Sequence, residues 1–296
     1  MRLAVHTGPI SVTNISGTTK VVGIWGYPVG HSRSPVMHTA ALASLGLDWV
    51  YVPFEVAPEN ARAAVEAIRA LGLIGVNVTV PLKELVLPYL DVVDEDAARI
   101  GSVNTICNVG GKLVGYSTDG AGFLRSLKEV GQSVDNRRVY LLGAGGSARA
   151  VAFALASRGN FCTIANRTMA RADELAATVN VVYPDHAEAV GWGTGTNAFD
   201  LLVNTTSVGM HPNPNEMPAL PPGAFDAEPF VYDLIYAPAQ TRLLAEADAA
   251  GCGTMNGVKM LVQQGAISLS LWTGLPVSEI PTAAMEQAVL GNLPTP

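Results

Sequence analysis

The sequence predicts an α/β fold that is divided into two domains. Its 296 residues exceed what one compact core comfortably holds. Runs of strand and helix character alternate along most of the chain, which is typical of a parallel sheet with helices on both faces. A glycine-rich turn, LLGAGGSARA at 141–150, joins an apolar run of strand character to a run of helix character. That arrangement indicates a Rossmann-like, doubly wound domain.

The composition excludes several classes of protein. Apolar residues make up 49% and charged residues 15% of the chain, with a formal net charge of −7, so we expect neither nucleic acid nor an anionic membrane as a partner. No stretch approaches the ~18 uninterrupted apolar residues of a membrane span, and the N-terminus makes a poor signal peptide. Cys107, Cys162 and Cys252 lack paired spacing, which favours a reducing, cytoplasmic location. The five histidines form no ligand motif, so we expect no metal.

The chain is expected to open with a loosely held extension at 1–19, because this stretch has no clear periodicity. Two strands and two helices should follow in alternation, at 20–28, 34–46, 49–56 and 58–71. Ser34 and Pro35 mark the start of the first helix, with Ser34 as its N-cap. Capping alone would explain this serine.

The segment GVNVTVPLK at 75–83 contains the next expected strand, which Pro81 ends. Valines alternate with Asn77 and Thr79, so one face is apolar and the other polar, and Lys83 follows just beyond the strand. A strand end that gathers Asn, Thr and Lys is where α/β sheets bind ligands. The alternative is an edge strand with a solvated face.

A hairpin is predicted where GSVNTICNV and KLVGY are joined by two glycines. Its second arm runs into STDGAGF, where Asp119 precedes a helix that ends near Gly131. An Asp at this position is by default an N-cap, so Asp119 has a purely structural alternative.

Alternation continues beyond the glycine turn, with strands expected at 161–165, 200–203 and 230–235 and helices at 171–179 and up to 249. The proline-rich tract at 211–223 should have no regular structure. A last long helix is expected at about 256–272, where Gln264 lies on an otherwise apolar stripe. Burying its amide unpaired would cost about 1–3 kcal/mol, so Gln264 needs a backbone or ligand partner.

The glycine turn matches the pattern G-x-G-x-x-G/A between a strand and a helix. Residues without side chains let a pyrophosphate approach the backbone, and the helix start points N–H groups and a positive dipole end at it. A tight turn with no ligand would also use glycines. We predict a dinucleotide site that comprises Gly143, Ala144, Gly145, Gly146, Ser147 and Ala148.

The residues beyond the second strand of this domain favour NADP over NAD. An NAD site has an acidic residue about 20 positions beyond the glycines, whereas this chain has Asn166, Arg167 and Thr168, with Arg171 one turn further. Arginine matches phosphate geometry with two parallel hydrogen bonds, which suits a 2′-phosphate. The alternative is a pair of ordinary surface arginines.

Taken together, these segments closely resemble the shikimate dehydrogenases of the shikimate/quinate dehydrogenase family. The resemblance covers residues 23–274 and is carried by HSRSPVMH, NVTVPLK, GSVNT, STDGAGF, GAGGSARA, NRTMAR, NTTSVGM, DLIY and the final helix. It implies a cleft between an NADP-binding domain at 120–255 and a discontinuous substrate domain formed by 1–119 and 256–296. It also implies a monomer or homodimer.

The resemblance implies a role for individual residues. Lys83 and Asp119 match the catalytic pair, and the substrate contacts correspond to Ser32, Ser34, Thr79, Lys83, Asn104, Asp119, Tyr236 and Gln264. On the cofactor side it adds Thr206 and Gly257 to the glycine turn and the arginine segment. Two positions depart from the family pattern: Ser117, where Asn is common, and Asn256, where Asp is common. Either could change hydrogen bonding near the cleft.

The implied activity is the reversible, NADP-dependent reduction of 3-dehydroshikimate to shikimate in the aromatic-precursor pathway. Lys83 would act as the general acid, held and kept charged by Asp119. Two alternatives stay open. A quinate or dual quinate/shikimate dehydrogenase would share every catalytic residue, and a regulatory protein that senses NADP would bind the cofactor without turnover.

Overall fold

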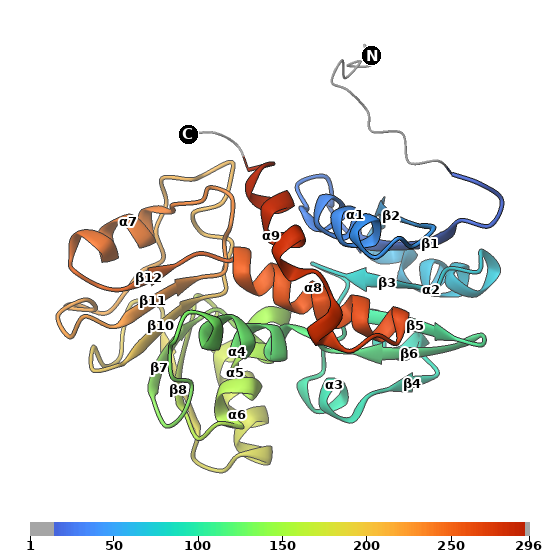
Figure 1. The fold of residues 1–296 in the computed structure, drawn as a ribbon. Helices are drawn as coiled ribbons and strands as arrows, with labels where there is room; N and C mark the ends of the chain where they lie inside the picture. Colours follow the sequence, from blue (N-terminus) through green and yellow to red (C-terminus); the bar gives the residue numbers. More distant parts are fainter. Residues whose placement is uncertain (1–14, 294–296) are drawn as a thin grey trace.

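The computed structural model describes residues 15–293. They form two α/β halves side by side, each built on a six-stranded sheet (Figure 1). Two helices, at 119–129 and 258–273, run between the halves. The predicted fold class is confirmed. Most of the extension expected at 1–19 lies outside the described residues. Within 15–293, no helix has the length and apolar character that a membrane crossing needs.

The first sheet is mixed and has the order β2-β1-β3-β5-β6-β4. Its strands are β1 Lys20–Gly26, β2 Trp49–Glu55, β3 Gly75–Val78, β4 Val92–Val93, β5 Thr105–Val109 and β6 Lys112–Tyr116. β1, β2 and β3 are parallel, while β5 runs antiparallel to β3 and to β6, as the predicted hairpin requires.

Helices cover both faces of the first sheet. One face packs against α1 Ser34–Ser44, α8 Val258–Thr273 and α9 Thr282–Leu290. The other face packs against α2 Ala61–Ala70 and α3 Glu95–Ile100. Short 3₁₀ turns lie at Pro58–Asn60, Leu87–Tyr89 and Val277–Glu279. Because α8 and α9 come from the end of the chain, this half is built from two distant segments.

The second sheet is entirely parallel, with the order β12-β11-β10-β7-β8-β9. Its strands are β7 Arg138–Leu142, β8 Phe161–Asn166, β9 Ala187–Gly191, β10 Leu201–Asn204, β11 Phe230–Asp233 and β12 Thr254–Met255. The chain starts in the middle and winds outward in both directions, so the strand order reverses between β7 and β10. Ligands bind at such a switch point, beyond the carboxyl ends of the strands.

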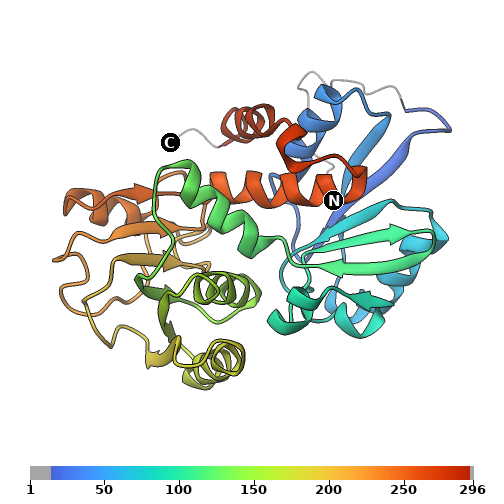
Figure 2. The same cartoon turned by 60° about the horizontal axis from the view of Figure 1, so that its bottom comes forward.

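Helices also cover both faces of the second sheet. α5 Gly146–Ala156 and α6 Met169–Val182 pack on one face, and α7 Arg242–Ala249 packs on the other. α4 Asp119–Glu129 adds Phe123 and Leu127 to the same core as α5. Figure 2 shows α4 and α8 lying side by side where the two halves meet.

Several expected details are wrong. Ser34 and Asp119 are not N-caps: each is the first residue of its helix, after Arg33 and Thr118 respectively. The strand expected to end at Pro81 ends already at Val78, because the chain turns there, and Val80 is 65% exposed. The edge-strand alternative is also wrong, since β3 lies between β1 and β5 with all four residues buried.

Candidate active site

A pocket of about 180 Å³ opens between the two halves. The first half contributes the ends of β1 and β3 and the start of α1. The second half contributes the start of α5 and the segment beyond β11, and α8 closes one side. Ten of the residues predicted for the site line it: Ser32, Ser34, Thr79, Lys83, Asn104, Asp119, Ser147, Tyr236, Gly257 and Gln264.

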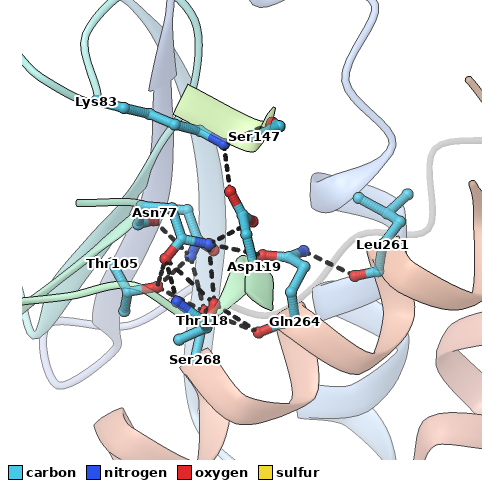
Figure 3. Close-up of polar contacts among 10 residues, drawn as sticks. Asn77, Lys83, Thr105, Thr118, Asp119, Ser147, Leu261, Gln264 and Ser268 are labelled. Atoms are coloured by element: carbon cyan, nitrogen blue, oxygen red, sulfur yellow. Dashed lines mark hydrogen bonds and ion pairs between the residues drawn. The ribbon is translucent and has the colours of Figure 1, made fainter. Parts of the chain in front are cut away.

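Lys83 and Asp119 form a buried ion pair in this pocket. The ammonium Nζ of Lys83 lies 2.5 Å from Asp119 Oδ2, and both side chains are at most 10% exposed. Lys83 also donates to the Ser147 hydroxyl, at 3.3 Å, across to the first turn of α5 (Figure 3). Asp119 is the first residue of α4.

Asn104 holds the other carboxylate oxygen of Asp119. Its Nδ2 donates to Asp119 Oδ1 at 2.8 Å, to Thr118 Oγ1 at 2.8 Å and to Gln264 Oε1 at 3.3 Å. Its Oδ1 accepts from the Thr118 backbone N–H at 2.7 Å. The amide of Gln264 in turn donates to the Leu261 carbonyl at 2.7 Å, so the backbone partner foreseen for Gln264 is present. Figure 3 shows Thr118, Asp119 and Gln264 close together, with the Gln264 amide pointing toward Leu261.

A second polar layer, which the sequence analysis did not assign, lies beneath this one. Asn77 Nδ2 donates to Ser268 Oγ at 2.9 Å and to Thr105 Oγ1 at 3.1 Å, and Ser268 and Thr105 are 2.7 Å apart. Asn77 Oδ1 accepts from the Tyr51 hydroxyl at 2.8 Å. Ser268 lies one turn after Gln264 on α8, so the period of that helix was the signal that could have found it.

Apolar packing holds Tyr51 in place. Its ring stacks on that of His38 with centroids 4.3 Å apart and planes 4° from parallel. Burial raises the pKa of Tyr51 well above its ordinary value, against the opposing effect of a hydrogen bond with Ser34. Burial lowers the pKa of His38 to about 3, so this histidine is a neutral packing residue at physiological pH.

The mouth of the pocket is lined by hydroxyl groups. Ser32 Oγ accepts from the Ser34 backbone N–H at 3.2 Å at the start of α1. Tyr236, which follows β11, reaches this loop from the second half: burial raises its pKa, opposed by a backbone hydrogen bond from Arg33 and by the positive charge of Arg33. Ser32, Thr79 and Tyr236 are half-buried, so they are open to a ligand.

The glycine turn lies at the carboxyl end of β7, beside the end of β8. Gly143 has φ +108°, and a side chain there would lie 2.5 Å from Thr205 Oγ1, so this position requires glycine. No atom lies within 4 Å of the place where a Gly145 side chain would begin. No side chain caps the start of α5. Its first N–H groups are therefore open to an anion.

Asn166, Arg167, Thr168 and Arg171 lie along the same edge of the sheet, outside the pocket. Asn166 Nδ2 donates to the Thr168 carbonyl at 2.9 Å and fixes the turn. Both arginines are exposed, and neither guanidinium has an ion-pair partner among residues 15–293. Thr206 is tied to the same edge by Asn204, whose Oδ1 accepts from its backbone N–H at 3.0 Å and from its hydroxyl at 2.7 Å.

The two departures from the family pattern, Ser117 and Asn256, are not among the lining residues. Asn256 Oδ1 accepts from the Val258 backbone N–H at 3.1 Å, and its Nδ2 donates to the Ala239 carbonyl at 2.9 Å. This asparagine therefore holds the loop before α8. Over the described chain, no group of three histidine, cysteine or acidic side chains is arranged to hold a metal ion.

A doubly wound sheet with an open glycine turn, facing a polar pocket with a lysine–aspartate pair, defines the class of two-domain dinucleotide-dependent dehydrogenases. Three family models match consecutive parts of the chain. They describe the shikimate dehydrogenase substrate binding domain at 24–106, shikimate / quinate 5-dehydrogenase at 125–208 and the shikimate 5′-dehydrogenase C-terminal domain at 257–290. The chain belongs to the shikimate dehydrogenase family.

Individual relatives agree with this assignment. The chain is 47% identical to the shikimate dehydrogenase (NADP(+)) of Moorella thermoacetica over 283 residues, 93% of this chain and 94% of the relative. A crystal structure of a shikimate dehydrogenase in complex with NADP+ has a TM-score of 0.90 at 39% identity, covering 97% of this chain and 100% of that one. The ligand-free 5-ketofructose reductase of a Gluconobacter strain has a TM-score of 0.84 at 36% identity, covering 93% and 99%.

Proposed function

We propose that the protein catalyses the reversible, NADP-dependent reduction of 3-dehydroshikimate to shikimate. The observation that carries this proposal is the buried Lys83–Asp119 pair, which faces the glycine turn across a pocket lined with hydroxyl and amide groups. The family assignment supports the choice of substrate, because the Moorella relative has this name.

The residues present fit the cofactor. The open backbone at Gly145 and the uncapped start of α5 suit a pyrophosphate. The exposed guanidiniums of Arg167 and Arg171 suit a 2′-phosphate, beside which an acidic residue would be unfavourable. Asn166, Thr168, Thr206 and Gly257 complete the proposed contacts. When bound, NADPH supplies a hydride to the carbonyl carbon of the substrate.

Lys83 supplies the proton that accompanies the hydride. Its ammonium stabilises the charge that develops on the carbonyl oxygen and transfers a proton from Nζ to that oxygen. In the oxidation direction the neutral amine of Lys83 accepts the hydroxyl proton. Asp119 holds the amine in place, and Asn104 fixes Asp119 through its other oxygen.

The remaining pocket residues orient the ring. We propose that Ser32 and Ser34 hold the carboxylate, while Thr79, Asn104, Asp119, Tyr236 and Gln264 hold the ring hydroxyls. These partners lie on both halves, so a ligand that contacts all of them brings the halves together. Such an arrangement excludes water from the reacting carbon.

The test is a spectrophotometric assay of NADPH formation with shikimate, quinate and a linear polyol as alternative substrates. Shikimate-dependent reduction of NADP supports the proposal. Comparable rates with quinate indicate the dual enzyme. NADP binding without turnover of any of the three indicates a sensing protein instead.

We expect shikimate to be preferred over quinate by at least about tenfold in kcat/KM. Quinate carries an added hydroxyl on the carbon that bears the carboxylate, beside Ser32 and Ser34. A hydroxyl buried there unpaired costs about 1–3 kcal/mol, and 1.4 kcal/mol is one decade. Equal kcat/KM values at saturating NADP would contradict this expectation.

We also propose that the enzyme works in the cytoplasm as a monomer or homodimer. Cys107, Cys162 and Cys252 are all free and buried, which suits a reducing compartment. Light scattering of the purified protein decides between the two oligomeric states, and a larger assembly would contradict both.

A further inference from the structure

The Lys83 ammonium has a hydrogen-bond acceptor in the half of the protein that carries the glycine turn. Its Nζ lies 3.3 Å from Ser147 Oγ, on the first turn of α5 (Figure 3). We infer that Ser147 is a positioning residue for the reaction, in addition to its predicted place in the cofactor site. Its hydroxyl aims the proton donor and links it to the cofactor turn. This inference rests on the proposed function, in which Lys83 moves the proton.

The geometry of an ammonium explains why a second acceptor matters. A lysine ammonium has three N–H donors that rotate together about the Cε–Nζ bond. Asp119 takes one donor at 2.5 Å and Ser147 takes another at 3.3 Å. Asp119 alone sets the rotation about Cε–Nζ, but the other torsions of Lys83 let Nζ swing about its contact with Asp119 Oδ2. The Ser147 hydroxyl is a second anchor that limits this swing, so the remaining N–H keeps one direction in the pocket that Lys83 lines.

Ser147 also suits both protonation states of Lys83. A hydroxyl accepts a hydrogen bond from an ammonium and can donate one to the lone pair of a neutral amine. The contact can therefore persist after the proton has moved from Nζ to the substrate oxygen. A carboxylate such as Asp119 can only accept.

Close packing holds the start of α5 against Lys83. A side chain at Gly146 would lie 3.0 Å from Ser102 Oγ and 3.2 Å from Lys83 Cδ. The backbone N–H of Val103 donates to the Lys83 carbonyl at 2.9 Å. The segment that precedes β5 therefore touches both the lysine and the glycine turn.

Arg149, two residues after Ser147, secures the same contact from α5. Its Nε donates to the Ile100 carbonyl at 2.7 Å, at the end of α3, and its side chain is only 14% exposed. A guanidinium at a helix C-terminus is favoured by the dipole and by the free carbonyl groups. Arg149 thus joins the start of α5 to the 100–103 segment and sets the distance between Ser147 and Lys83.

The test compares Ser147→Ala with the wild-type enzyme in shikimate oxidation across a range of pH. We expect kcat to fall about 5- to 10-fold, less than the roughly 10²- to 10⁴-fold contribution of a group that itself transfers the proton. The Ser147 hydroxyl accepts a hydrogen bond from the Lys83 ammonium, so its removal should move the midpoint of the pH–rate profile down. The backbone N–H at this position remains, so the NADP dissociation constant should change less than twofold.

Two variants serve as comparison and control. Arg149→Met should give a smaller shift of the same sign, and it should add nothing to the midpoint shift in the Ser147→Ala background. Ser157→Ala is the matched control. Ser157 follows the other end of α5, and its hydroxyl donates to the Ala154 carbonyl within the same helix. It should leave both kcat and the midpoint unchanged.

A measurement without turnover separates this inference from the proposed function. The chain has few lysines, so NMR of protein labelled at its lysine side chains can follow the titration of Lys83, identified by its loss in Lys83→Met. A lower midpoint in Ser147→Ala supports the inference even if shikimate is not oxidised, a result that would contradict only the proposed function. An unchanged midpoint overturns the inference, as does a fall in kcat matched by an equal weakening of NADP binding.

Discussion

The two ends of the cleft are built in opposite ways. At the substrate end, the side chains of Asn104 and Thr118 are bonded to each other, and those of Asn77 and Thr118 are bonded to α8. At the cofactor end, no side chain caps the N–H groups at the start of α5, and the guanidiniums of Arg167 and Arg171 have no ion-pair partner within the described chain. The first arrangement fixes geometry in advance, and the second leaves donors free for a ligand. Substitutions should therefore alter turnover at one end and affinity at the other.

The largest expected effect is at the substrate end. Lys83→Ala should lower kcat by about 10²- to 10⁴-fold, because a proton donor acts mainly in the transition state. The KM for shikimate should change much less. Steady-state kinetics checks the split between the two constants, with exposed Lys112→Ala as a control. A near-normal kcat would remove Lys83 from the mechanism.

The next effect concerns Asp233, the last residue of β11, which should make the stability of the protein depend on pH. Burial raises the pKa of Asp233 to about 6, against hydrogen bonds from Thr241, Ile235 and Asn204. The folded state then binds the proton more tightly than the unfolded state, whose carboxyl titrates near 3.8. The contribution of Asp233 to stability is thus greatest below pH 4 and is lost as the pH rises through 6. The loss is about 3 kcal/mol at 1.36 kcal/mol per pH unit.

Asp233→Asn removes this titration. Its free energy of unfolding relative to wild type should rise between pH 4.5 and pH 7, as measured by urea denaturation. Exposed Asp135→Asn is the control. A difference between variant and wild type that does not depend on pH would show that Asp233 stays charged throughout.

At the cofactor end the expected effect is confined to affinity. A charged hydrogen bond contributes about 1.5–3 kcal/mol, so Arg167→Ala should raise the KM for NADP roughly tenfold or more while leaving kcat and the KM for NAD nearly unchanged. Arg158→Ala, which removes an exposed arginine paired with Asp135, is the control. An equal loss with both cofactors would assign Arg167 a structural role only.

The smallest expected effect concerns the second polar layer. Ser268→Ala removes one acceptor from Asn77 inside the buried network and should lower the free energy of unfolding by about 1 kcal/mol. Ser44→Ala is the matched control, because Ser44 makes the same bond to the carbonyl four residues earlier but is exposed. Thermal melting of the two variants and the wild type compares their losses of stability. Equal losses would mean that the network adds nothing beyond that local bond.

Sequence patterns predicted the fold and its main elements, because apolar periodicity and glycine turns are local signals. They also placed Gln264 in the core with a partner. The weak β9, the short β4 and β12, and the helices α3 and α9 were not predicted, since their stability depends on neighbours that periodicity does not show. Local patterns alone favoured capping for Ser34 and left it as an alternative for Asp119, because capping is the commonest local use of Ser and Asp. The pairing of Asp119 with Lys83, 36 positions away, came from the family resemblance and not from any local signal.

The second polar layer was not predicted, for a similar reason. Asn77 and Ser268 are 191 positions apart, and a lone serine in a helix is usually satisfied by its own backbone. Tyr51 and Thr105 read as ordinary strand residues. The contact between Ser268 and Asn77 depends on how α8 lies on the first sheet.

The position of α8 and α9 in the chain has a consequence for synthesis on the ribosome. The apolar face formed by Val22, Met37 and Tyr51 is completed only by residues from Val258 onward. The first half emerges first, but its apolar face stays exposed to solvent until α8 and α9 have left the exit tunnel. The second half is nearly continuous in sequence and can close its core earlier. Domains usually fold in the order in which they are made, and we expect the reverse order for this chain.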